Sequence, residues 1–235
     1  MGVQTSMIEI QTSNGAMKAQ LAKPEGAGPF PAVLVIMEAF GLNGHIKDVA
    51  QRIAAEGYVT LAPDIFHRSG ELCTAGYDDL PAALKLMGAL TDEGIVTDVR
   101  SAIQTLTQDS SVRADRIGIT GFCMGGRVSY LAASALPDKI AAAAPFYGGG
   151  IPIDRTANLK APVLAFFGDE DPFIPMDHVH ALEAEAKRYG KNVEVVVYPK
   201  APHGFFCNER DSYRPEAAKD SWEKLKAFFA KHLKA

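Results

Sequence analysis

The chain has 235 residues, which is enough to bury one well-formed core, and we predict a single domain over residues 1–235. Charged residues make up 22% of the chain and the formal net charge is −4, with no basic run, so the composition argues against a nucleic-acid or membrane partner. Three cysteines, Cys73, Cys123 and Cys207, lack disulfide or zinc spacing and fit a reducing compartment. No charged segment followed by an apolar run opens the sequence, so we expect a cytoplasmic location.

Short β-rich runs alternate with longer helical patterns along the whole chain. The predicted strands are, in order, MIEIQTS, MKAQLAKP, PAVLVIMEA, YVTLAPD, RIGITGF, KIAAAAPFYG, PVLAFFGDED and VEVVVYP. Asn14-Gly15 between the first two is a hairpin turn signal. The predicted helices cover residues 44–56, 78–90, 93–108, 124–136, 175–189 and 215–234. Apolar strands separated by helices predict an α/β fold, with a mostly parallel central sheet that is covered by helices on both faces.

Sheets of this kind place ligand chemistry at the carboxyl ends of their strands, so candidate functional residues should follow strands. Cys123 follows RIGITGF in the sequence GFCMGGR, with Gly121 and Gly125 two residues to either side. This frame is typical of a sharp strand–turn–helix motif that exposes its central residue at a helix N-terminus, where a thiolate is favoured. We predict that Cys123 is a nucleophile. The alternative is a small buried cysteine in a glycine-rich turn.

Two further candidates follow later strands. His203 lies in KAPHGFF after the last predicted strand, and Asp171 follows PVLAFFG. The order Cys, Asp, His matches the Ser, Asp, His order of α/β-hydrolases. His203 would take the thiol proton and return it to the leaving group, and Asp171 would fix the imidazole tautomer. Asp169 and Glu170 are alternatives for the acid. A surface histidine and a helix-capping aspartate are the structural alternatives.

Glu38 stands at the end of the apolar run PAVLVIM, where burial of an unpaired carboxylate would be expensive. We interpret it as a second base for the thiol or a partner for a cationic group, with a solvated glutamate at the strand end as the alternative. The oxyanion of an acyl-transfer reaction needs backbone donors. We expect these from Met124, directly after the nucleophile, and from Ala39.

With these residues in place, the sequence resembles the dienelactone hydrolase (carboxymethylenebutenolidase) family of the α/β-hydrolase fold. The resemblance covers nearly the whole chain, and its marks are M-E-A-F-G-L-N at 37–43, A-P-D-I-F at 62–66, G-F-C-M-G-G-R at 121–127, D-E-D-P-F-I-P at 169–175 and P-H-G-F at 202–205. It implies a triad of Cys123, His203 and Asp171, with Glu38 in contact with the thiol. It also implies hydrolysis of small lactones or esters through an acyl-thioester, without a metal or organic cofactor.

The sequence departs from the family at the residues that hold a substrate carboxylate. The best-known members use two arginines, but this chain has Cys207 at one of these positions and the arginine-free stretch YDDLPAALKLM in the region of the other. Arg127 and Arg68 could supply charge instead, and Tyr147 could line the pocket. The favoured alternatives are two ordinary surface arginines and a core tyrosine.

The chemistry of a thiol nucleophile limits the classes of substrate that it can cleave readily. A thiol ionises with modest help, and a thiolate also leaves readily, so activated lactones and esters suit it better than amides. Three competing interpretations remain: a carboxylesterase or other small-acyl hydrolase of the same fold, a non-catalytic ligand-binding homologue, and a redox protein using Cys123. The last is disfavoured because no C-x-x-C motif is present. The sequence indicates no oligomeric state.

Overall fold

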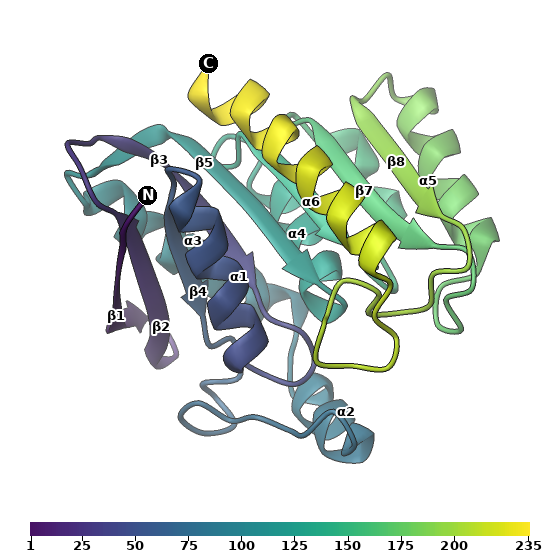
Figure 1. Ribbon diagram of the computed structural model, residues 1–235, viewed down its shortest axis with the longest axis horizontal. Coiled ribbons are helices and arrows are strands. Elements are labelled where there is room, and N and C mark those ends of the chain that lie inside the picture. The colour runs from purple at the N-terminus through teal and green to yellow at the C-terminus, as the bar shows by residue number, and fades with distance from the viewer. The chain divides into compact units, whose positions relative to one another are not determined.

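The computed structural model describes all residues from 1 to 235 (Figure 1). Its strands are β1 (Val3–Thr12), β2 (Gly15–Pro24), β3 (Phe30–Ile36), β4 (Val59–Pro63), β5 (Val112–Phe122), β6 (Ala142–Phe146), β7 (Val163–Gly168) and β8 (Val193–Tyr198). Its helices are α1 (Gly44–Ala55), α2 (Leu80–Gly88), α3 (Asp92–Gln108), α4 (Met124–Ala135), α5 (Met176–Arg188) and α6 (Pro215–Phe229), with a 3₁₀ helix η1 (Ile153–Asn158) and a π-helical end η2 (Ala230–Lys234). Every predicted strand and helix is present, and the α/β class is confirmed.

The chain forms two compact units, Met1–Gly118 and Ile119–Ala235. In the first, the strand order is β1-β2-β4-β3, followed by the beginning of β5. β1 and β2 form an antiparallel hairpin, β2 pairs antiparallel with β4, and β3 pairs parallel with β4. The hairpin prediction is confirmed, but its turn lies one residue earlier than Asn14-Gly15, because Thr12 pairs with Gly15 and Gly15 itself takes a positive φ of 116° as the first residue of β2.

Helices α1 and α3 pack on the strands of this first unit (Figure 1). Both are amphipathic, and each starts at a polar N-cap, Asn43 or Thr91, whose side chain accepts a backbone N–H from the first turn. β3 and β4 are buried along almost their whole length, which explains their continuous apolar sequence. The first unit therefore holds β3 so that its carboxyl end leads directly into the loop that carries Glu38 and Ala39.

In the second unit, the end of β5 is followed in the sheet by β6, β7 and β8. β7 pairs parallel with both β6 and β8. Parallel strands bring their carboxyl ends to one edge, so the segments that follow β5, β7 and β8 start near one another. Aromatic rings fill the core beside this edge: the Phe146 ring stacks on Phe166 at 4.3 Å and lies 4.8 Å from Phe122, and Phe122 stacks on Phe206 at 5.2 Å between centroids.

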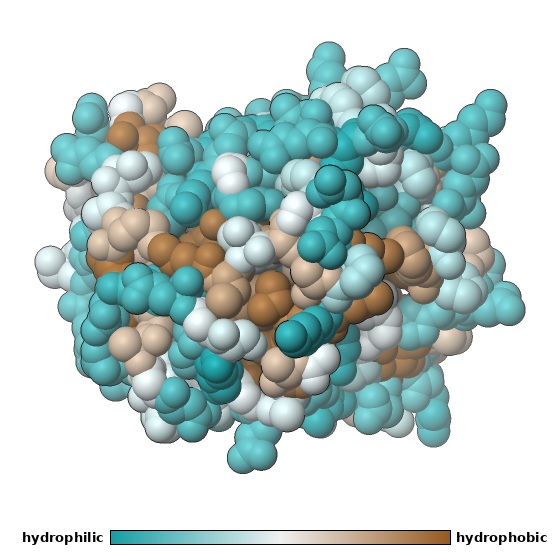
Figure 2. Space-filling view, turned by 90° about the horizontal axis from the view of Figure 1, so that it is seen from below, coloured by the Kyte–Doolittle hydropathy of each residue, from teal (hydrophilic) through white to brown (hydrophobic).

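The surface carries mixed polarity. The face drawn in Figure 2 shows many hydrophilic residues with hydrophobic ones among them. No helix combines the length and the hydropathy that a membrane span requires. The single domain over residues 1–235 stays a prediction.

Candidate active site

Cys123 lies at a strained turn between β5 and α4. Its φ of 56° and ψ of −117° are unusual for a residue with a side chain. The neighbouring structure holds this conformation, because the Cys123 N–H donates to the Phe146 carbonyl at 3.1 Å and its own carbonyl accepts the Gly126 N–H at 2.9 Å. The thiol is partly exposed at the first turn of α4. The predicted strand–turn–helix geometry is therefore present.

The glycines around Cys123 are required by close backbone approaches. A Cβ on Gly121 would overlap the Gly125 carbonyl, and a Cβ on Gly126 would overlap the Phe146 carbonyl. The strand and helix can fold back on each other this tightly only when these side chains are absent. This accounts in physical terms for the first and last glycines of the pattern G-x-C-x-G-G.

Asp171 and His203 are in direct contact. Asp171 Oδ2 lies 2.7 Å from His203 Nδ1, and both residues are 8% exposed. The second oxygen, Oδ1, accepts the backbone N–H of Phe173 at 2.8 Å. The alternative acids lie elsewhere: Asp169 Oδ1 accepts the Lys200 N–H at 2.6 Å, and Glu170 is exposed. Of the three acids in this loop, the structure brings Asp171 to the histidine.

The loops that follow β7 and β8 are joined by backbone hydrogen bonds. The Asp169 N–H donates to the Tyr198 carbonyl at 3.1 Å, and the Glu170 N–H donates to the Ala201 carbonyl at 3.2 Å. Gly168 allows this contact, because a Cβ there would overlap the Ala201 carbonyl. These two hydrogen bonds hold the loop that carries the acid next to the loop that carries the histidine.

The charge of His203 follows from its surroundings. Burial alone would lower the pKa of the imidazole, but the hydrogen bonds to Asp171 and Cys123, together with their negative charges, raise that pKa to about 9. Because Nδ1 is bonded to Asp171, Nε2 is the nitrogen that remains for the Cys123 thiol. A ring with this pKa is cationic at neutral pH and holds a proton it can transfer.

Two aromatic rings flank His203. Tyr147 is fully buried with φ of 36°, and its ring centroid lies 5.1 Å from that of His203 in an edge-to-face arrangement. Phe173 meets the imidazole at 5.2 Å with an interplanar angle of 86° and is 63% exposed. The structure thus places Tyr147 beside the candidate histidine. Phe173 was not predicted as a site residue, because its only signal in the sequence is its place in D-E-D-P-F-I-P.

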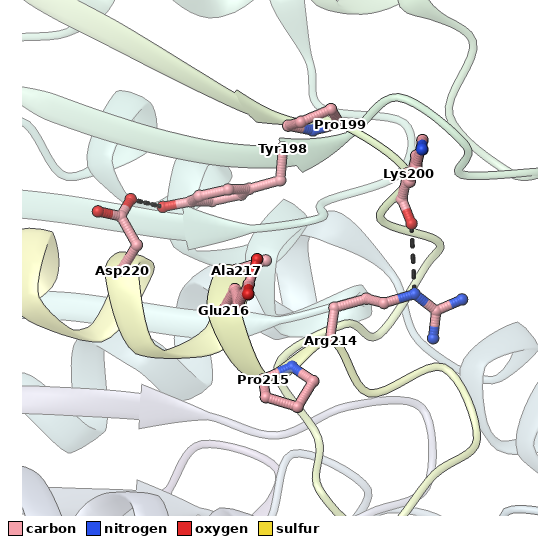
Figure 3. Close-up of a pocket in the computed structure, with 8 residues that line it drawn as sticks. All are labelled: Tyr198, Pro199, Lys200, Arg214, Pro215, Glu216, Ala217 and Asp220. Carbon is pink, nitrogen blue, oxygen red and sulfur yellow. Dashed lines mark hydrogen bonds between the residues drawn. The ribbon is translucent and has the colours of Figure 1, made fainter.

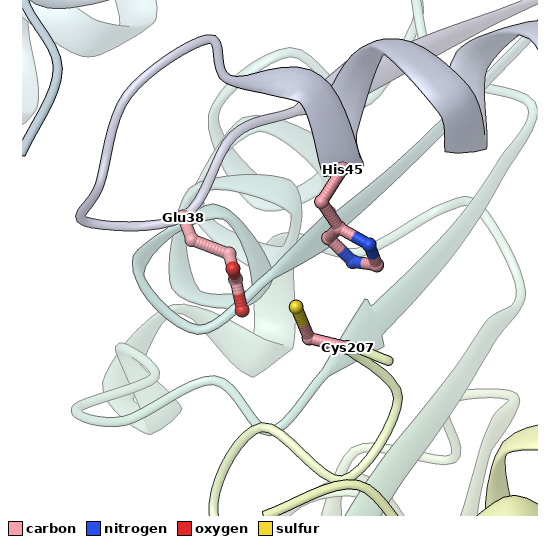
Figure 4. Close-up of side chains that lie close together, drawn as sticks. All are labelled: Glu38, His45 and Cys207. Atoms are coloured by element: carbon pink, nitrogen blue, oxygen red, sulfur yellow. The ribbon is translucent and has the colours of Figure 1, made fainter. Parts of the chain in front are cut away.

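Glu38 and Ala39 follow β3 in the first unit. Glu38 is fully buried, so it is not the solvated glutamate of the alternative interpretation. One of its carboxylate oxygens lies within 4.8 Å of a ring nitrogen of His45. In Figure 4 the two side chains extend from the backbone in the same direction. This pair alone offers too few ligands for a typical protein metal site. The expected contacts of Glu38 with the Cys123 thiol and of Ala39 with an oxyanion join residues of different units and stay predictions.

The arginines proposed for substrate binding have structural partners. Arg68 donates to both carboxylate oxygens of Asp98 at 2.7 Å, and Asp98 is fully buried and also 3.2 Å from His67 Nε2. Arg127 donates from Nε to the Gly150 carbonyl at 3.1 Å. The paired bonds to Asp98 favour a structural role for Arg68. Contact with substrate stays a prediction for both.

A cavity of about 700 Å³ lies elsewhere in the second unit (Figure 3). It is lined by Tyr198, Pro199, Lys200, Arg214, Pro215, Glu216, Ala217 and Asp220. Two hydrogen bonds join residues that line it. The Tyr198 hydroxyl donates to Asp220 at 2.8 Å, and Arg214 Nε donates to the Lys200 carbonyl at 3.3 Å. None of the three candidate triad residues lines it, so its size does not make it the reaction site.

Comparison with known proteins identifies relatives over the full length. The sequence profile of the Dienelactone hydrolase family matches residues 17–233. A protein of Synechocystis sp. provisionally named carboxymethylenebutenolidase is 38% identical, covering 99% of this chain and 98% of that protein. A Bradyrhizobium protein provisionally named 2-oxo-3-(5-oxofuran-2-ylidene)propanoate lactonase is 33% identical over 96% of this chain and 94% of its own length.

A solved structure agrees with these relatives. The crystal structure of a Klebsiella pneumoniae protein provisionally named dienelactone hydrolase superposes with a TM-score of 0.92 at 34% identity, covering 98% of this chain and 100% of that one. The family and the hydrolase class expected from the sequence are therefore confirmed: the chain belongs to the dienelactone hydrolase family, with the α/β-hydrolase fold.

Proposed function

We propose that this protein hydrolyses small lactones and activated esters with Cys123 as nucleophile, His203 as acid and base, and Asp171 as the acid that orients the histidine. One geometric observation supports the proposal above all others. His203 is held by Asp171 at 2.7 Å, and its remaining nitrogen is available to a thiol that a strained turn exposes at the start of α4. Membership of the family supports the same reaction class.

The first half of the reaction forms an acyl-enzyme. The raised pKa of His203 keeps the imidazole protonated at neutral pH, so a proton is available for the departing oxygen. The Cys123 thiolate adds to the substrate carbonyl, and the backbone N–H of Met124, with that of Ala39, stabilises the oxyanion. The carbon–oxygen bond then breaks as His203 Nε2 gives its proton to the departing oxygen. In a lactone this oxygen stays attached to the acyl group.

The second half regenerates the enzyme. Neutral His203 takes a proton from water as the water oxygen adds to the thioester carbonyl. The carbon–sulfur bond breaks, and the acid product leaves the thiolate and imidazolium in place. Asp171 keeps the proton on Nδ1 throughout, so that Nε2 always faces the reaction. Buried Glu38 is proposed as a second polar partner of the thiol.

The substrate class follows from the nucleophile. A thiolate is a better leaving group than an alkoxide, so the first tetrahedral intermediate goes forward only when the substrate oxygen also departs easily. Enol esters, aryl esters and unsaturated lactones meet this condition. The name of the Bradyrhizobium relative describes an unsaturated lactone as the substrate of that protein, which is the same chemical class.

A substrate panel with cysteine variants tests the proposal. We expect hydrolysis of p-nitrophenyl acetate and of an aryl lactone such as dihydrocoumarin, and no cleavage of a peptide anilide. Cys123→Ala should abolish both activities, while Cys73→Ala, the matched change at another partly exposed cysteine, should leave them intact. Full activity in Cys123→Ala would refute the proposed mechanism. Efficient anilide cleavage without ester cleavage would refute the substrate class.

A further inference from the structure

Phe173 is an apolar side chain in an unusual position. It is 63% exposed, although most large apolar side chains of this chain are buried. Its ring nevertheless has a fixed neighbour, because it meets the His203 imidazole edge-to-face at 5.2 Å and 86°. An exposed aromatic ring beside a candidate catalytic histidine still has apolar surface in contact with water. Contact with an apolar part of a ligand would bury that surface.

The backbone N–H and the aromatic ring of Phe173 make different contacts. Its N–H donates to Asp171 Oδ1 at 2.8 Å and helps to orient the carboxylate that holds His203. Any residue except proline can supply that N–H. The orientation of Asp171 therefore does not require the ring, and the imidazole has a second aromatic neighbour in the buried Tyr147 ring. The exposed ring is thus available for another role.

The position of the ring indicates which part of a substrate it would meet. In the proposed reaction His203 delivers its proton to the departing oxygen, so the alcohol portion of the substrate approaches the imidazole. The Phe173 ring centroid is only 5.2 Å from that imidazole. The acyl portion is bonded to Cys123 instead.

We propose that Phe173 is a specificity-determining residue that packs against the alcohol portion of the substrate and selects aromatic or extended unsaturated alcohols and enols. The inference rests on the proposed function, because it takes His203 as the group that protonates the leaving oxygen. In a lactone the same contact would be made by the enol end of the ring.

Two ester series separate the alcohol from the acyl portion. Phenyl acetate and 2-naphthyl acetate vary the alcohol, and phenyl acetate and phenyl butyrate vary the acyl group. In Phe173→Ala, kcat/KM for 2-naphthyl acetate should fall roughly tenfold, the effect of one lost aromatic contact, and that for phenyl acetate should fall less. The butyrate-to-acetate ratio should not change. Phe173→Leu should fall between wild type and Phe173→Ala.

The matched control is Tyr189→Ala. Tyr189 is 41% exposed and lies at the far end of α5, which spans about 20 Å at 1.5 Å per residue. This variant should leave both series unchanged. An equal fall of Phe173→Ala on all esters would indicate a structural role and overturn the inference, as would unchanged selectivity. The alkaline limb of the pH profile should stay in place, since the Asp171–His203 pair is retained.

A binding measurement keeps the inference testable apart from catalysis. In the Cys123→Ala background, 2-naphthol binding is measured by calorimetry with Phe173 present and with Phe173→Ala added. We expect the second substitution to raise Kd roughly tenfold. Persistent esterase activity in Cys123→Ala would refute the proposed function alone. An unchanged Kd, or no binding of 2-naphthol when Phe173 is present, would overturn the role of Phe173.

Discussion

Asp171→Asn removes the negative charge beside His203 while keeping the shape of the side chain. The rise of the His203 pKa from 6.5 to about 9 corresponds to about 3 kcal/mol in favour of the imidazolium, at ~1.4 kcal/mol per pKa unit. A hydrogen bond to a charged group contributes about 1.5–3 kcal/mol. The buried 2.7 Å contact with Asp171 therefore supplies a large part of the rise, and its loss should bring the pKa of His203 down to about 7–8.

The assay is the pH dependence of kcat/KM between pH 6 and 10, with phenyl acetate, whose leaving group needs a proton. The imidazolium is the donor, so wild-type activity should fall as the pH rises through about 9. In Asp171→Asn this limb should move down to about 7–8. At pH 8 the activity should fall at least about a hundredfold, because the asparagine can also offer an N–H to Nδ1 and favour the wrong tautomer.

The control lies two residues away on the same loop. Asp169→Asn keeps an oxygen that can accept the Lys200 N–H and does not touch His203, so its profile should match wild type. An alkaline limb that is identical in wild type and Asp171→Asn would refute the assignment of the raised pKa to this pair.

Three further changes test other parts of the structure. Gly168→Ala should lower the free energy of unfolding in urea by about 1–3 kcal/mol, because the new Cβ overlaps the Ala201 carbonyl. Gly88→Ala, with open space at its Cβ, should instead raise that free energy by up to about 1 kcal/mol, and equal effects would contradict the clash. Asp98→Ala should lower the free energy of unfolding by about 1.5–3 kcal/mol, because it removes the fully buried carboxylate that accepts from Arg68; an unchanged Tm would contradict this. The raised pKa of His203 should contribute a fall in the free energy of unfolding as the pH rises from about 6.5 to 9, since the folded imidazole keeps a proton that the unfolded imidazole loses. His203→Gln should weaken that fall, and an unchanged pH dependence would exclude the linkage.

The order of strands and the residues that follow them could be predicted because parallel strands impose a simple rule. Cys123 stands directly after an apolar run and His203 in the loop after the last one, and the glycines around Cys123 indicate a tight turn. The choice among the three acids could not be made from the sequence. It depends on the path of the loop, which turns Asp169 toward the Lys200 N–H and Asp171 toward His203.

Other features depend on tertiary packing that local patterns do not encode. The first hairpin turn lies one residue before the expected Asn-Gly pair because Gly15 takes the positive φ within the strand. The burial of Glu38 was expected only as one of two possibilities, and the structure resolves it. Phe173 carried no signal of its own, since an exposed phenylalanine in a loop resembles any other until its ring is seen against His203.

The most direct test of the account is the identity of the residue that carries the acyl group. The protein is mixed with p-nitrophenyl acetate, quenched in acid during the first turnover and analysed by peptide mass. The account predicts one acetyl group on Cys123, in step with a burst of nitrophenolate, and neither in Cys123→Ala. A burst with acetyl on any other residue, or hydrolysis that continues in Cys123→Ala, would contradict it.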